Sequence, residues 1–186
     1  MKTSRPAKGK ARRLAFVHAE WHYDGIVENA LSACHQRLGE LHYDHERLVD
    51  TFAQPGSLEI PFLCQELALS GKYEAIIAFG LIVNGGIYRH EFVASAVLDG
   101  MMRVQLDTRV RIFSCVLTPI NFHEHETHHD FFSHHMLHKG AEVAEAFIKT
   151  VHPELWKAHG GEQVKSAESD NGVRARGARR REEMNV

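Results

Sequence analysis

The strongest chemical signal in the sequence is a glycine pair followed by charged residues, in the segment NGGIYRHE at residues 84–91. Paired glycines let a backbone approach a ligand closely. Arg89 and His90 follow, where a helix is expected to begin. The arginine suits contact with a phosphate, and the histidine suits proton transfer near neutral pH. The glycine spacing matches neither the dinucleotide nor the P-loop fingerprint, which disfavours nucleotide binding. A plain turn with exposed charges is the alternative.

Two further segments carry residues suited to a flat, polar ligand. Trp21 follows the apolar run 14–18, and its ring can stack on a heterocycle or close the rim of the core. In PGSLEIP, residues 55–61, a helix begins beside Ser57 and Glu59, and its free N–H groups can bind a carbonyl oxygen or an anion. Glu59 can also accept hydrogen bonds from ring N–H groups. Alternatively, Ser57 caps the helix and Glu59 complements its dipole.

A histidine-rich segment, TPINFHEHETHHD at residues 118–130, raises the question of a metal. On a helix, His125 and His129 share a face, as do Glu124 and His128, and that spacing can hold zinc. However, the segment contains no H-E-x-x-H, and no cysteine lies near it. We therefore expect no metal site, although a metal-dependent enzyme is a competing hypothesis. The chain also lacks the G-x-S-x-G elbow of many acyl-transfer enzymes.

The elements that must position these segments alternate between strand and helix. Apolar runs predict strands at 14–18, 47–52, 75–83 and 110–117, the third being the most apolar. Helical spacing predicts helices from an N-cap at Asp24 to Leu38 before Gly39, over 60–67 with an end near Ser70-Gly71, and over about 92–104. Two more helices are expected to close the domain, one through the histidine-rich segment and one along 141–151.

This alternation predicts an α/β fold, a three-layer α/β/α sandwich around a mainly parallel four-stranded sheet. In such sheets ligands bind outside the carboxyl ends of the strands. All four chemically unusual segments directly follow predicted strands. The sequence therefore predicts one site, built from these segments at one edge of the sheet.

Composition limits the remaining possibilities. A chain of 186 residues allows one domain, expected at 14–159, between a disordered basic arm at 1–13 and a disordered polar tail at 160–186. The net charge of −2 disfavours a general nucleic-acid or membrane-surface binder. Without a leader or a membrane-length apolar run, a cytoplasmic protein is expected. Cys34, Cys64 and Cys115 lie in apolar surroundings and are expected to be buried, reduced thiols.

Several motifs together resemble the lumazine synthase family. They are AEWH, PGSLEIP, AFGLIV followed by GGIYRHEFV, and the late HKG, and they occur in the family's order between Leu14 and Val151. The form of the third and fourth segments is similar to the second bacterial type. The resemblance implies a flavodoxin-like winding of the sheet. It also implies a transferase of riboflavin biosynthesis that condenses 5-amino-6-(D-ribitylamino)uracil with 3,4-dihydroxy-2-butanone 4-phosphate to give 6,7-dimethyl-8-ribityllumazine.

The resemblance further implies that the enzyme needs no metal or organic cofactor. Its only partners would be the two small-molecule substrates and other copies of the chain, with neither nucleic acid nor membrane. Family members form pentamers with active sites between subunits, and some pair them into decamers or pack them into capsids. The competing hypothesis is a paralogue that binds a lumazine or flavin with little or no synthase activity.

Residue roles follow from the same resemblance. Those implied to contact substrate are Trp21, which stacks on the pyrimidine; Ser57, Leu58 and Glu59, which bind the pyrimidine and ribityl groups; Leu81, Ile82 and Val83, which offer backbone contacts to the ring; Gly86 and Ile87, which receive the phosphate; Ser114, which replaces an aromatic near the ketone; and His128, which replaces a phosphate-binding arginine.

The chain departs from the family pattern at the catalytic position. Arg89 aligns with the proton-transferring histidine, and His90 lies one place later. Consecutive residues at a helix start point in different directions, so they cannot share a role. An arginine stays charged near neutral pH and is a poor general base. We therefore expect Arg89 to stabilise the phosphate and His90 to carry the proton.

Overall fold

The computed structural model describes residues 13–84, 89–119 and 126–159, with side chains from residue 130 onward in the last segment. Its strands are β1 (Arg13–Ala19), β2 (Val49–Gln54), β3 (Tyr73–Leu81) and β4 (Arg111–Leu117). They form one sheet in the order β2-β1-β3-β4, and each neighbouring pair is parallel. The predicted parallel four-stranded sheet is confirmed, and this order fits a flavodoxin-like winding.

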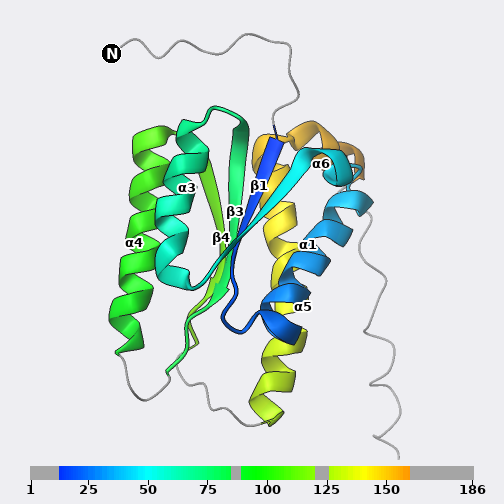
Figure 1. The fold of residues 1–186 in the computed structure, drawn as a ribbon. Helices are drawn as coiled ribbons and strands as arrows, with labels where there is room; N and C mark the ends of the chain where they lie inside the picture. The colour runs from blue at the N-terminus through cyan, green and yellow to red at the C-terminus, as the bar shows by residue number, and fades with distance from the viewer. Residues whose placement is uncertain (1–12, 85–88, 120–125, 160–186) are drawn as a thin grey trace, which may run out of the picture.

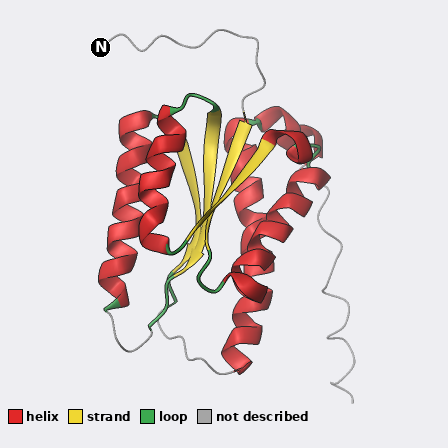
Figure 2. Ribbon diagram, in the orientation of Figure 1, coloured by secondary structure: helices red, strands yellow, loops and turns green. Residues whose placement is uncertain are grey.

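Helices cover both faces of the sheet (Figures 1 and 2). On one face lie α1 (Glu28–Glu40) and α5 (Glu126–Val151), and on the other lie α3 (Ile60–Leu69) and α4 (His90–Thr108). The short helix α2 (His45–Leu48) precedes β2, and α6 (Pro153–His159) follows α5. Two irregular turns, η1 (Tyr23–Val27) and η2 (Ser57–Glu59), follow β1 and β2. The predicted three-layer sandwich is therefore confirmed.

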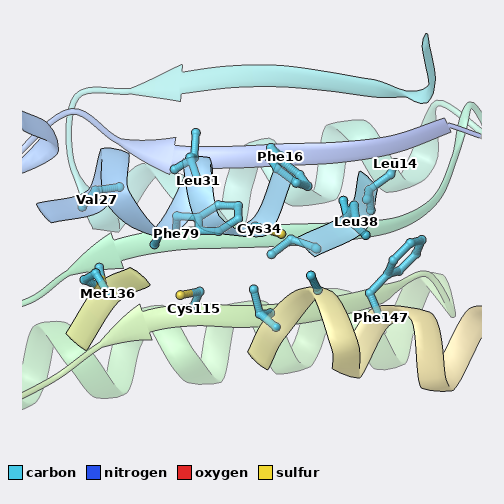
Figure 3. Packing of buried hydrophobic residues seen from close by; sticks show 14 of the residues in the cluster. Leu14, Phe16, Val27, Leu31, Cys34, Leu38, Phe79, Cys115, Met136 and Phe147 are labelled. Carbon is cyan, nitrogen blue, oxygen red and sulfur yellow. The ribbon is translucent and has the colours of Figure 1, made fainter. Parts of the chain in front are cut away.

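Each face of the sheet buries its own apolar cluster, which is why the central strands β1 and β3 are apolar along most of their length rather than alternating. Leu14 and Phe16 of β1 point to the α1/α5 side, and Ala15 and Val17 point to the α3/α4 side. Between the sheet and α1/α5, Phe16 packs against Phe79 with ring centroids 5.0 Å apart (Figure 3). This layer holds the largest fully buried rings of the described residues.

The start of the first helix was predicted wrongly. Asp24 is not the N-cap, because it lies inside the turn η1, and α1 begins only at Glu28 with Val27 at the N-cap position. Gly25 follows with φ +70°, a left-handed conformation that glycine adopts without strain. The chain needs this irregular turn to change direction after β1. Nor does Gly39 end the helix, which continues to Glu40.

The two predicted closing helices are one continuous helix, α5, with 26 residues. Gly140 does not interrupt it, because this glycine has a packing role. A Cβ atom at position 140 would lie 2.1 Å from the backbone oxygen of Ala30, so only glycine allows α5 to approach α1 this closely. Arg47 was expected in the second strand and lies in α2 instead, since β2 begins at Val49.

All three cysteines are free and buried, as expected. Burial raises the pKa of the Cys64 and Cys115 thiols to about 12, and that of Cys34 well above its usual value. These thiols therefore stay protonated and behave as apolar side chains. In the described part of the chain, none of the helices has the length and apolar character needed to cross a membrane.

Candidate active site

A pocket of about 350 Å³ opens where β1, β2 and β3 end and α4 begins. The residues that line it lie after β1, after β2, at the end of β3 and at the start of α4: Trp21, Pro55, Gly56, Ser57, Leu58, Glu59, Leu81, Ile82, Val83, His90 and Val93. Its volume lies in the usual range of small-molecule sites. The predicted convergence of separate segments at one edge of the sheet is thus visible for the first three of them.

The first wall is Trp21, which follows β1. Its side chain is 59% exposed in the isolated chain, and its ring stacks on that of His22 with centroids 5.6 Å apart. The N–H of Glu20 donates to the carbonyl of Gln54 at 2.8 Å, which joins the loop after β1 to the loop after β2. Trp21 therefore lies at the rim of the pocket, where its free face can stack on a flat ring.

The second wall is the turn η2. Gly56 is extended, residues 57–59 form a single 3-10 turn, and buried Ile60 anchors the start of α3. No side chain caps this turn, so the alternative role of Ser57 as a cap is not observed. A Cβ atom at Gly80 would lie 3.1 Å from the Ser57 hydroxyl, so the bare glycine lets Ser57 lie against β3. Leu58 and Glu59 are exposed at the rim.

The floor of the pocket is the end of β3. Leu81 and Ile82 are buried, and Val83 is partly buried. The N–H of Ile82 donates to the carbonyl of Leu117 at 2.9 Å, which continues the sheet one residue beyond β3. This floor is apolar, so a flat ring can lie on it while the residues at the rim supply polar groups.

The two residues at the start of α4 differ in position. His90 lines the pocket, its side chain is only 13% exposed, and its Nδ1 lies 3.6 Å from a carboxylate oxygen of Glu91. Arg89 is exposed, with its guanidinium carbon 5.5 Å from the ring centroid of Phe92, and it is absent from the pocket lining among the described residues. The helix start directs the two side chains apart, as expected.

The remaining predicted residues lie elsewhere or outside the description. Gly86 and Ile87 lie outside the described residues. His128 belongs to the first turn of α5, and its side chain lies outside the description too. Ser114 lies on β4 with an exposed side chain; its hydroxyl accepts the N–H of Val116 at 3.3 Å, and it does not line the described pocket.

Three lining residues were not predicted as site residues: Pro55, Gly56 and Val93. Val93 lies three residues after His90 on α4, so the helical spacing of i and i+3 was a signal that could have identified it. Across the described side chains, those of residues 13–84, 89–119 and 130–159, there is no group of three or more histidine, cysteine or acidic residues that could hold a metal ion. All four histidine-segment residues weighed as ligands, Glu124, His125, His128 and His129, have side chains outside these ranges.

The fold and the pocket define a class: a parallel α/β protein that binds a small molecule at the carboxyl ends of its strands. Comparison with known proteins identifies the family within that class. Residues 11–154 match the family model of 6,7-dimethyl-8-ribityllumazine synthase. The chain belongs to this family, which confirms the resemblance drawn from the motifs.

Curated relatives agree over most of the chain. A 6,7-dimethyl-8-ribityllumazine synthase of Rhodococcus erythropolis is 52% identical over 76% of this chain and 90% of its own length. A 6,7-dimethyl-8-ribityllumazine synthase 2 of Bradyrhizobium diazoefficiens is 51% identical over 78% of this chain and 86% of its own. Another synthase 2, from Pseudomonas syringae pv. tomato, is 43% identical over 75% of this chain and 81% of its own.

Proposed function

We propose that the protein condenses 5-amino-6-(D-ribitylamino)uracil with 3,4-dihydroxy-2-butanone 4-phosphate to form 6,7-dimethyl-8-ribityllumazine. The amine and the ketone form an imine with loss of water, inorganic phosphate leaves, and ring closure releases a second water. One observation carries the proposal: Trp21, the turn 57–59, the end of β3 and His90 surround one pocket. Because amines and ketones react readily, the main contribution of the site is to hold the two substrates close together in the orientation that the reaction needs.

In this scheme the pyrimidine ring lies on the apolar floor formed by Leu81, Ile82 and Val83 and stacks against Trp21. The carboxylate of Glu59 accepts hydrogen bonds from the ring or ribityl group, and Ser57 and Leu58 border the ribityl chain. The rim position of these side chains supports the assignment, because a substrate with one flat end and one polyhydroxy end needs an apolar floor and a polar edge.

His90 is the proton carrier of the proposal, and Arg89 stabilises the phosphate. The support is the position of the His90 ring in the pocket lining and of Arg89 at the exposed helix start. His90→Ala should lower kcat about tenfold or more while changing either KM less than threefold. Steady-state kinetics with both substrates checks this, and His90→Gln is the matched variant that keeps bulk and polarity. An unchanged kcat in His90→Ala would remove His90 from this role.

The phosphate site is completed by Gly86, Ile87 and His128 in this proposal, with Ser114 near the ketone. A histidine binds phosphate best as an imidazolium. His128→Ala should therefore raise the KM for the butanone phosphate, with the largest increase at low pH. A KM that is indifferent to the substitution across the pH range would exclude His128 from the phosphate site.

The active unit is proposed to be an oligomer built on pentamers, with each active site between two subunits. Support comes from large apolar side chains that the single chain leaves exposed on α3 and α4, among them Phe62, Leu69, Met102 and Leu106. Such patches mark association surfaces. Because Ser114 lies outside the pocket of its own subunit, we assign it, with His128, to the pocket of a neighbour.

We place the reaction in the cytoplasm. The butanone phosphate is a charged small molecule, and charged molecules do not cross a lipid bilayer unaided. The enzyme must therefore share a compartment with the reaction that makes this substrate. Fractionation of cells that produce the protein tests the placement, and synthase activity in an extracytoplasmic fraction would contradict it.

The decisive experiment mixes the purified chain with both substrates and follows the absorbance of the lumazine product together with released phosphate. Equal amounts of lumazine and phosphate, formed only with both substrates present, support the synthase. Binding of the ribitylaminouracil without product would instead identify a binding paralogue. Activity that is lost on chelation and restored by a metal would favour a metal-dependent enzyme.

A further inference from the structure

The position of Trp21 depends on the backbone beneath it. Trp21 is 59% exposed, so packing around its side chain does little to hold the indole in place. The backbone of the loop that carries Trp21 must therefore determine where the indole lies over the pocket. That loop contains two left-handed residues, His22 at φ +58° and Gly25 at φ +70°. The N–H of Tyr23 donates to the carbonyl of Glu20 at 3.1 Å, and the N–H of Val27 donates to that of His22, also at 3.1 Å. The loop thus passes directly into the turn η1.

Two side chains hold this turn from the side of α1 and α5. The carbonyl oxygen of Gly25 accepts a hydrogen bond from the Asn29 amide at 2.8 Å and one from the Ser133 hydroxyl at 2.6 Å. The same Asn29 amide lies 2.7 Å from the Ser133 hydroxyl and 3.1 Å from the Ser133 carbonyl oxygen. Both side chains are partly buried, and they come from positions 104 residues apart in the sequence.

The triangle of Gly25, Asn29 and Ser133 matters because the turn departs from helical geometry. Asp24 and Gly25 interrupt the regular helix, and Ser133 adds to the Gly25 carbonyl a bond that local helical hydrogen bonding does not supply. Loss of one partner leaves a part-buried acceptor or donor less well satisfied, which favours movement of the turn. The groups are uncharged amide and hydroxyl, so this anchor does not titrate.

We propose that Asn29 and Ser133 are positioning residues that set the place of Trp21 over the pocket and thereby the affinity for the pyrimidine substrate. The inference rests on the proposed function for its substrate, but the anchoring of Trp21 itself does not. Neither residue lines the described pocket; each acts through Gly25 and the three residues between Gly25 and Trp21.

The test uses a Trp156→Phe background, in which Trp21 is the single tryptophan of the chain, since the sequence contains two. Ser133→Ala and Asn29→Ala are compared with this background by titration of Trp21 fluorescence with the ribitylaminouracil. We expect the Kd to rise about fivefold for each variant, an effect equal to the net contribution of about one hydrogen bond. The KM for this substrate should rise in parallel, with kcat and the KM for the butanone phosphate within twofold.

Two matched variants separate positioning from general damage. Thr150→Ala removes another hydroxyl of α5 that donates to a backbone carbonyl, that of Ala146 at 2.6 Å, and it should leave pyrimidine binding unchanged. Ser133→Thr keeps the hydroxyl and should restore most of the affinity lost in Ser133→Ala. An equal Kd increase in Thr150→Ala, or no recovery in Ser133→Thr, would overturn the proposal.

A measurement without substrate distinguishes this proposal from the proposed function. In ligand-free protein, Ser133→Ala and Asn29→Ala should change the acrylamide quenching and the emission maximum of Trp21, while Thr150→Ala should not. Identical quenching in all variants overturns the positioning role whatever the protein binds. Wild-type protein that fails to bind the pyrimidine, with quenching changed as expected, would refute the substrate assignment alone.

Discussion

The two faces of the sheet differ in how completely one chain covers them. Toward α1 and α5, the rings of Phe16, Phe79 and Phe147 are fully buried (Figure 3). Toward α3 and α4 the sheet is also covered, but the outer surfaces of these helices expose large apolar side chains, with Phe62 at 70% and Leu106 at 69% exposed. The helix α5 also exposes Phe131 and Leu137, so the difference is one of degree, and the larger exposed apolar surface lies on α3 and α4.

Polar side chains follow the same division. Between α1 and α5, the guanidinium of buried Arg37 donates to Glu145 at 2.9 Å and to Glu40 at 2.9 Å. This pairing satisfies a buried charge inside the subunit. The pocket, by contrast, is built next to α3 and α4, and its polar groups lie at an open rim. Apart from the Asn29–Ser133 anchor beneath Trp21, we therefore expect changes in the α1/α5 layer to affect stability, and changes in the α3/α4 layer to affect assembly and activity.

The largest effect is expected for Phe147→Ala in the α1/α5 layer. Removal of a fully buried ring should lower the free energy of unfolding by about 3–5 kcal/mol, from lost burial and the cavity left behind. Urea denaturation monitored by circular dichroism measures it. Phe62→Ala is the matched control, because the same atoms are removed from an exposed position. If both variants lose equal stability at concentrations where the chain is monomeric, the two layers do not differ as described.

The next effect concerns assembly through α4. Leu98, Met102 and Leu106 are exposed at intervals of four residues and form one apolar stripe. Met102→Glu would place a charge in a buried contact, which should weaken association by about 3 kcal/mol and reduce the mass measured by analytical ultracentrifugation. Met102→Leu keeps the surface apolar and should leave the mass unchanged. An intact oligomer in Met102→Glu would show that the stripe is not the association surface.

A smaller effect is expected at the rim of the pocket. Trp21→Ala should weaken binding of the pyrimidine by about 1–3 kcal/mol through loss of a stacking contact. The free energy of unfolding should change by less than about 0.5 kcal/mol, because the ring is exposed. Isothermal titration calorimetry and thermal unfolding measure the two quantities, and Trp21→Phe should retain part of the affinity. A large loss of stability would place Trp21 with the structural residues instead.

The smallest effect is a pH dependence at the opposite end of the sheet. His152, between α5 and α6, has its Nε2 2.8 Å from a carboxylate oxygen of Glu74 and its Nδ1 3.3 Å from one of Glu154. The hydrogen bond with Glu74 raises the pKa of His152, partly opposed by desolvation. A raised pKa means that protonation stabilises the fold at a pH below the usual value near 6.5, and that this contribution is lost as the pH rises through the higher folded value.

Wild type and His152→Gln should therefore differ most in melting temperature near pH 5.5 and least well above neutral pH. Partial exposure limits the difference to about 1 kcal/mol. The hydroxyl of Tyr43 also faces Glu74, at 3.5 Å, so Tyr43→Phe serves as the control that leaves the imidazolium pair intact. A difference that grows with rising pH would contradict the assignment.

The sequence predicted most of the architecture because the central strands β1 and β3 are strongly apolar runs, each followed by a helical pattern. Prediction failed where tertiary contacts overrode local preference. Gly140 should weaken a helix, yet the close approach to Ala30 makes it a packing residue within α5. Asp24 is a good N-cap by residue type, but the chain must turn after β1, so the helix starts four residues later.

The position of the candidate site could also be predicted from the order of strands and helices. The placement of some of its residues could not. Parallel strands place their carboxyl ends at one edge, so the segments at Trp21, 55–59 and 81–83 had to meet. Which of Arg89 and His90 lines the pocket depends on the residue at which α4 begins. A shift of the helix start by one residue would bring the other side chain into the pocket. Ser114 could not be placed from one chain, because its partner surface belongs to another subunit in the proposed assembly.

Position 140 has a consequence for how this family is recognised from sequence. The HKG motif helped to identify the chain, and its final residue is the glycine whose missing side chain lets two helix backbones touch. The glycine of the motif therefore records a steric requirement of the scaffold rather than a requirement of turnover. A homologue could keep this signature after it had lost every reacting group, whereas one with a bulkier residue there would have to separate its first and fifth helices.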